Sequence, residues 1–178
     1  MNKISAAILC TIALCTLFLG EISAQSRYAG LTFSYAGCGL DYSFDIDDKN
    51  FAEFQLRAET AEMFRSFHRY PGISASAVWN LIFASTLSRN GNTIRFYSGP
   101  GISAGYSRDI LAPAGLFFGL KGRVGAECSF PRGISISINL SPMIGGHFII
   151  KDEMLNMRLF KVGLLYGTMP EVSVRYKF

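Results

Sequence analysis

Residues 160–178 read FKVGLLYGTMPEVSVRYKF, and apolar and polar side chains alternate along this stretch. The even positions, from Phe160 through Val172 to Phe178, are mostly apolar, whereas the odd positions are mostly small or charged. Successive side chains of a β-strand point to opposite faces. The whole stretch is therefore predicted to be one strand with an apolar face and a polar face.

Seven further segments alternate in the same way, and they are 30–35, 40–46, 52–59, 73–88, 94–107, 116–130 and 134–148. Between the first two, the apolar positions change from odd to even numbers across residues 36–39, which read AGCG. A strand changes phase only at a bulge or a turn. A turn gives eight strands and a bulge gives seven, and we take the turn.

The connections between these segments alternate in length. Residues 47–50, 89–92 and 131–133 are rich in Asp, Asn, Gly and Pro and are predicted to form tight turns. Longer loops are predicted over residues 60–72, 108–113 and 151–157. Short turns at one end and long loops at the other are typical of outer-membrane barrels. We therefore expect an all-β fold, an eight-stranded antiparallel up-and-down transmembrane barrel over residues 25–178.

The polar faces carry balanced charge, with six acidic and six basic residues on the alternating segments. In a soluble barrel such as a lipocalin the charges would face water and the apolar side chains would fill the interior. In a membrane barrel the apolar band faces lipid, and charges sealed in a narrow lumen are tolerated only when paired. We predict the second orientation, with a lumen network of Asp41, Asp45, Glu53, Arg57, Glu59, Arg95, Lys121, Arg123, Glu127, Glu171 and Arg175.

Aromatic residues near the two ends of the segments are predicted to form two girdles at the membrane interfaces. The girdle at the turn end would contain Phe44, Phe54, Phe96, Phe130, Tyr176 and Phe178, and the girdle at the loop end Tyr35, Tyr106, Phe148 and Tyr166.

The first 24 residues have the pattern of a cleavable signal peptide. Lys3 precedes the apolar run 4–19, and residues 20–24 offer a cleavage site before Gln25. A transmembrane anchor is the alternative interpretation of the same run. Cleavage would leave two cysteines, Cys38 and Cys128, which the predicted topology places near opposite ends of the barrel as free thiols.

Hydrophobic residues make up 49% of the chain and charged residues 17%, and the net charge of +4 is spread along the sequence. A nucleic-acid-binding protein would show a basic block or stripe, which this sequence does not contain. We expect no nucleic-acid partner.

The ending PEVSVRYKF resembles the C-terminal strand by which outer-membrane proteins are recognised for insertion by the barrel-assembly machinery. In this chain that resemblance assigns the insertion signal to Val172, Val174, Tyr176 and Phe178. Residues 25–178 resemble the small barrels of the OmpA/OmpX-like class, particularly the outer-membrane β-barrel domain proteins of Bacteroidetes. The resemblance implies a monomer in the outer membrane of a Gram-negative bacterium, in contact with outer-membrane lipid and lipopolysaccharide. It implies little about activity, because one fold hosts many functions.

The leading hypothesis for function is a structural or surface-interaction protein without enzymatic activity, cofactor or metal. A narrow channel is one alternative. A lipid A-modifying enzyme is another, because two such enzymes resemble this barrel in size. Their chemistry would involve His68 or His147, yet Ile149 occupies the position where the deacylase pattern has a serine. Arg65, His68 and Arg69 could also contact lipopolysaccharide phosphates, and a solvated loop is the simpler interpretation.

Overall fold

The computed structural model describes residues 26–60, 71–88, 91–110, 112–151 and 154–178, with the side chains of Ile150 and Lys151 left out. The predicted signal peptide at residues 1–24 lies outside the described residues. So does the loop that carries Arg65, His68 and Arg69.

Almost the whole described chain is β-structure, in which each strand pairs antiparallel with its neighbours. One short helix interrupts the pattern near the C-terminus. The elements are β1 (Arg27–Ser34), β2 (Gly37–Asp45), β3 (Asn50–Glu59), β4 (Gly72–Leu87), β5 (Thr93–Arg108), β6 (Ala114–Ser129), β7 (Ile134–Leu140), β8 (Met143–Lys151), β9 (Met154–Leu159), α2 (Lys161–Gly167) and β10 (Glu171–Lys177).

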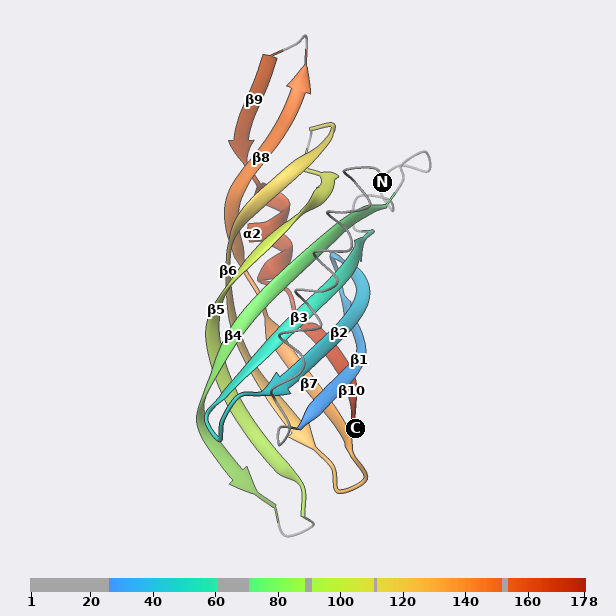
Figure 1. Cartoon of the computed structure of the whole chain (residues 1–178). Coiled ribbons are helices and arrows are strands. Elements are labelled where there is room, and N and C mark those ends of the chain that lie inside the picture. Colours follow the sequence, from blue (N-terminus) through green and yellow to red (C-terminus); the bar gives the residue numbers. More distant parts are fainter. Residues whose placement is uncertain (1–25, 61–70, 89–90, 111, 152–153) are drawn as a thin grey trace, which may run out of the picture.

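The sheet closes on itself, as Figure 1 shows. The last strand pairs with the first, with Val174 of β10 opposite Leu31 of β1. Strands β7 and β8 share one position in the ring, because β7 pairs with the half of β6 that ends at Ser129 and β8 with the half that begins near Leu116. Strand β9 pairs with β8 alone and lies outside the ring. The other nine strands thus fill eight positions, and the predicted eight-stranded antiparallel barrel is confirmed.

The junction between the first two segments is a turn, as predicted. Tyr35 and Ala36 connect β1 to β2, and the two strands pair along their length, with Phe33 opposite Cys38. At the other end of the barrel, Asp47 organises the β2–β3 turn by accepting hydrogen bonds from the backbone N–H groups of Lys49 and Asn50, each at 2.8 Å. Together with the side-chain amide of Asn50, these bonds lower the pKa of Asp47.

Two predictions for the C-terminal third of the chain are wrong. Residues 151–157 were expected to form a long loop, but β8 and β9 form a hairpin with only residues 152 and 153 between them. The stretch from residue 160 was expected to be one strand, but its first part is α2 and only Glu171–Lys177 is extended.

The helix forms because another part of the chain satisfies its first turn. The carboxylate of Asp109, which follows β5, accepts a hydrogen bond from the backbone N–H of Val162 at 2.8 Å. Helix N-termini carry unpaired N–H groups, which such an acceptor stabilises. Val162 and Tyr166, four residues apart, then share the buried side of α2, whereas Leu164 and Leu165 are exposed.

The apolar faces of the strands point out of the barrel and the polar faces point in. Along β7, Ile134, Ile136 and Ile138 are exposed, while Ser135 and Ser137 are almost completely buried. This orientation is the reverse of a lipocalin-like barrel. Among the described residues, no helix has the length and hydropathy needed to cross a membrane.

Gly133 offers a test of the turn geometry. Its φ of +82° lies in the left-handed region, so we expect Gly133→Ala to lower the free energy of unfolding by roughly 1–2 kcal/mol. Gly122→Ala is the matched control, because an added Cβ there would meet no atom closer than 4.0 Å. Urea unfolding in detergent, followed by the fluorescence of the single tryptophan, measures both variants. Equal stability of the two variants would contradict the assigned turn.

Candidate functional site

The structure places all the charged residues of the predicted lumen network on the inner side of the barrel wall. Seven are buried and four are partly buried at the ends of the lumen. The buried ones are Asp41, Glu53, Lys121, Arg123, Glu127, Glu171 and Arg175, and the partly buried ones are Asp45, Arg57, Glu59 and Arg95.

Arg175 of β10 is the centre of this network. Its Nε donates to Asp41 Oδ1 at 2.7 Å, its Nη1 to Glu127 Oε2 at 2.7 Å, and its Nη2 to Glu53 Oε2 at 2.8 Å and Asp41 Oδ2 at 3.1 Å. The three acidic partners stand on β2, β6 and β3, so one guanidinium connects four strands across the lumen. The planar array of five donors on arginine suits this role.

Arg123 of β6 forms a second cluster beside the first. It pairs with Glu53 and, at 2.9 Å, with Glu171, and its Nε donates to Ser141 Oγ at 3.1 Å. Glu171 also pairs with Arg57. Because Glu53 is shared by Arg123 and Arg175, the two clusters form one continuous ion-pair network.

Gln55 of β3 links the buried lysine to this network. Lys121 Nζ donates to Gln55 Oε1 at 3.0 Å and to Ser76 Oγ at 3.2 Å. The amide of Gln55 donates in turn to Glu171 at 2.7 Å and Asp41 at 3.2 Å. Gln55 was missing from the predicted site because it carries no charge, although its position on the polar face of its segment was the signal that could have identified it.

The charges of this network balance. The paired carboxylates are Asp41, Asp45, Glu53, Glu127 and Glu171, and the cations are Arg57, Arg95, Lys121, Arg123 and Arg175. Glu59, near the loop end, instead accepts a hydrogen bond from Ser74 Oγ at 2.5 Å. Charges withdrawn from water are tolerated when they are paired and hydrogen-bonded, and this arrangement meets that condition.

Aromatic side chains fill the lumen on the turn side of the network. Arg95 pairs with Glu127 and, at 3.0 Å, with Asp45, and its guanidinium lies 5.3 Å from the ring centre of Phe51. Phe51 packs edge-on against Tyr97 with ring centres 4.9 Å apart, and both residues are buried. Sequence reasoning missed these two inward aromatic residues because it assigned the inner face to small and charged side chains.

An apolar cluster fills the lumen on the loop side of the network. Phe117 of β6 stacks on Phe160 with ring centres 4.3 Å apart, and Met143, Val162 and Tyr166 pack around them. We call this cluster, together with α2, the apolar plug. A cavity of about 40 Å³ remains between the plug and the charged network. A space of this size holds a water molecule but not a larger ligand.

His147 lies buried beside the plug. Its Nε2 is 3.0 Å from the backbone carbonyl oxygen of Ser107, and its ring stacks on Phe160 with centres 5.7 Å apart. Its Nδ1 has no hydrogen-bond partner, so the ring bonds to no hydroxyl or carboxylate among the described residues. The other histidine, His68, lies outside them. Within the described part of the chain, no group of three or more His, Cys, Asp or Glu residues could hold a metal ion.

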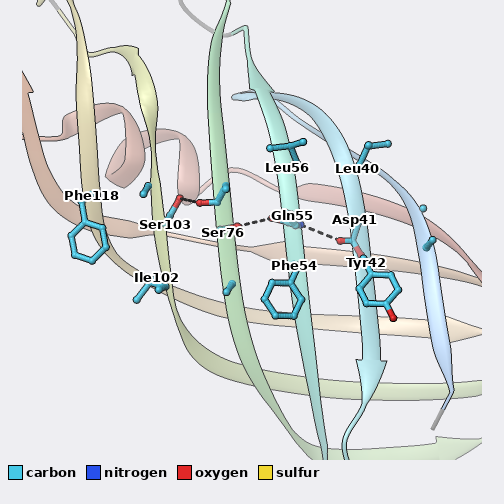
Figure 2. A pocket seen from close by; sticks show the side chains of 15 residues that line it. Leu40, Asp41, Tyr42, Phe54, Gln55, Leu56, Ser76, Ile102, Ser103 and Phe118 are labelled. Carbon is cyan, nitrogen blue, oxygen red and sulfur yellow. Dashed lines mark hydrogen bonds between the residues drawn. The ribbon is translucent and has the colours of Figure 1, made fainter. Parts of the chain in front are cut away.

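The outer surface is apolar around the ring. Figure 2 shows part of it, a shallow groove of about 620 Å³ across β1 to β6, surrounded by large residues such as Tyr42, Phe54 and Phe118. On the inner side of the same strands, Gln55 bonds to Asp41 (Figure 2).

The four residues of the predicted insertion signal lie on or directly after β10. Val172, Val174, Tyr176 and Phe178 all point outward and are 37% to 65% exposed. They form an apolar strip on the closing strand of the barrel.

The aromatic residues of the predicted girdles are mostly exposed, Tyr35 and Tyr176 by 60% and 59%. Tyr166 is an exception at 6%, because the helix turns it into the plug, where it contacts Tyr35 with ring centres 5.1 Å apart. Cys38 and Cys128 are free thiols.

Comparison of the chain with known protein families, with curated proteins and with solved structures finds no match.

The network predicts the effect of removing its central cation. Arg175→Met leaves three buried carboxylates with fewer partners, so we expect a loss of about 3–5 kcal/mol in the free energy of unfolding. Arg132→Met, on an exposed turn, is the control and should change stability by less than about 0.5 kcal/mol. Urea unfolding in detergent measures both.

A second variant tests whether Arg175 acts through its partners. Asp41→Asn combined with Arg175→Met should lose less than the sum of the two single losses, because each single change already breaks the contact that both residues share. Additive losses would show that the ion pair contributes nothing to the coupling between β2 and β10.

Proposed function

We propose that this chain is an integral β-barrel protein of a Gram-negative outer membrane, with a structural or surface-interaction role and a filled lumen. The observation that carries the proposal is the distribution of side chains across the barrel wall. Ionised groups are sealed inside as pairs, whereas leucine, isoleucine and phenylalanine side chains are exposed around the outside.

In water, this outer surface would be an apolar patch much larger than the few hundred Å² that monomeric proteins expose. In a bilayer the same surface is favourable, and a closed ring of strands satisfies the backbone hydrogen bonds that lipid cannot. The exposed aromatic residues near the turn end, such as Phe130 and Tyr176, are placed as interfacial residues would be.

The arrangement of the lumen supports a plugged barrel over a narrow channel. A path along the axis would have to pass the aromatic pair of Phe51 and Tyr97, the paired charges around Arg175, and the apolar plug. Each layer is made of side chains in direct contact. Moving ions through them would require breaking buried ion pairs, which is unfavourable.

The proposal predicts where the protein is found and how it migrates on a gel. The full chain, expressed in a Gram-negative host, should sediment with outer membranes and require detergent for extraction. Its unboiled form should migrate differently from its boiled form, because a closed barrel resists unfolding in the sample buffer. Recovery of the processed chain as a stable monomer without detergent would disprove membrane insertion.

The filled lumen predicts that the barrel does not conduct ions. The purified barrel, added to a planar lipid bilayer, should produce no steady conductance steps above those of a detergent-only control. Reproducible steps of one size would contradict the plugged lumen and favour the narrow channel.

A further inference from the structure

Strand β9 has a free edge. It pairs with β8 on one side, whereas each of the other nine strands has a partner on both sides. Figure 1 shows the β8–β9 hairpin extending beyond the rest of the loop end. All six residues of β9 are exposed, so neither of its faces is covered.

The register identifies the backbone groups on this edge. The N–H of Phe160 donates to the carbonyl of Gly145 at 2.9 Å, which marks these two residues as a hydrogen-bonded pair. Backbone groups in an antiparallel ladder point alternately toward and away from the neighbouring strand. The N–H and C=O groups of Leu155, Met157 and Leu159 therefore point away from β8, and no described residue bonds to them.

The side chains beside this free edge are mostly apolar and exposed. Leu155, Met157 and Leu159 are exposed by 67%, 69% and 54% on the outer face, and Met154 is 68% exposed on the other. The exposed apolar side chains of β1, β2, β7 and β10, by contrast, belong to strands that pair with a neighbour on both sides. Contact with lipid would cover these side chains but would leave the backbone groups of the free edge without hydrogen bonds, and open sheet edges do not occur in the hydrocarbon region.

The free edge arises from the unequal height of the barrel wall. The β1–β2 hairpin ends at Tyr35 and Ala36, and β10 pairs with β1 only up to Ser34. Beyond that level the chain turns into α2, which packs inside against Phe117 and Met143. No strand of the described chain therefore reaches the open side of β9.

We propose that β9 accepts an extended segment of another polypeptide as an additional strand. Exposed sheet edges bind peptides in this way, with affinity from the backbone and selectivity from alternate side chains. The partner segment would carry apolar residues on alternate positions, and acidic residues near the exposed Arg158 and Lys161. The inference rests on the proposed function, which exposes this end of the barrel to the outside of the cell.

A second copy of this chain does not fit the edge. Two barrels in one membrane point the same way, so a twofold axis between them would run along the membrane normal. Such an axis would make the two β9 strands parallel. It would also turn the leucine faces of the two strands to opposite sides of the joined sheet, so that they could not form one continuous apolar surface. A different polypeptide has no such restriction.

Binding can be measured with a fluorescein-labelled nonapeptide in which valine and threonine alternate between terminal glutamates. Fluorescence anisotropy with the detergent-solubilised full chain should show saturable binding. Met157→Pro should weaken it roughly ten-fold or more, because proline removes an N–H that points to the free edge and breaks no bond to β8. Met157→Ala is the matched control, since it removes the same side chain but keeps the N–H, and it should lose far less affinity than Met157→Pro.

A second measurement uses the unaltered protein, in case the proline variant fails to fold. Two versions of the peptide are N-methylated, each on one of the two sets of alternate residues, so that each version loses its N–H donors on one edge only. One of the two methylated peptides should bind and the other should not. Equal binding of both, or equal binding of Met157→Pro and Met157→Ala, would show that the contact is not strand pairing and would overturn the inference.

The failure of this inference can be told apart from failure of the proposed function. A chain that shows the heat-dependent gel shift of a barrel but binds no peptide refutes the free-edge site alone. A chain that is soluble without detergent refutes membrane insertion, and the peptide assay can still be run on it in buffer. Concentration-dependent dimerisation that Met157→Pro abolishes would assign the edge to a second copy and refute the proposed partner.

Discussion

The pairing of buried charges is the constraint on which the rest of this structure depends. Arg175 stands on the last strand, and its three carboxylate partners stand on β2, β3 and β6. These strands lie on different sides of the lumen, so their charges can be satisfied together only in the closed ring. An open sheet would leave a guanidinium and three carboxylates without their partners, a state that is unfavourable away from water. Closure between β1 and β10 and charge satisfaction therefore reinforce each other.

The sequence predicted the orientation of the strands well, because a period of two is a local property of the chain. The alternation of Ile134, Ile136 and Ile138 with Ser135 and Ser137 required no knowledge of distant residues to assign an inner and an outer face. The membership of the charged lumen followed from the same alternation. The partners did not, because they depend on the register across the barrel: Arg175 bonds to Asp41, which lies 134 residues earlier.

The helix is a second case in which a local sequence pattern does not reveal contacts between distant residues. Residues 160–168 alternate as a strand would, yet Asp109 caps the helix from 53 residues away and the plug accepts Val162 and Tyr166. A contact between distant residues thus outweighs a local pattern over one short segment. Gln55 was missed for a related reason. Its value to the site comes from joining Lys121 to Glu171 and Asp41, which no property of residue 55 alone reveals.

The uneven height of the wall connects the plug to the free edge of β9. Where β1 and β2 end, the chain has no neighbouring strand to pair with and turns inward as α2, so the lumen is closed by Phe160 and Val162. The hairpin that rises beside this gap keeps one edge unpaired, although its outer face continues the apolar surface of the barrel. Apolar side chains favour lipid, whereas unpaired backbone groups require water or another strand. Both requirements are met at once by a polypeptide partner that pairs with the backbone of β9 and covers its side chains.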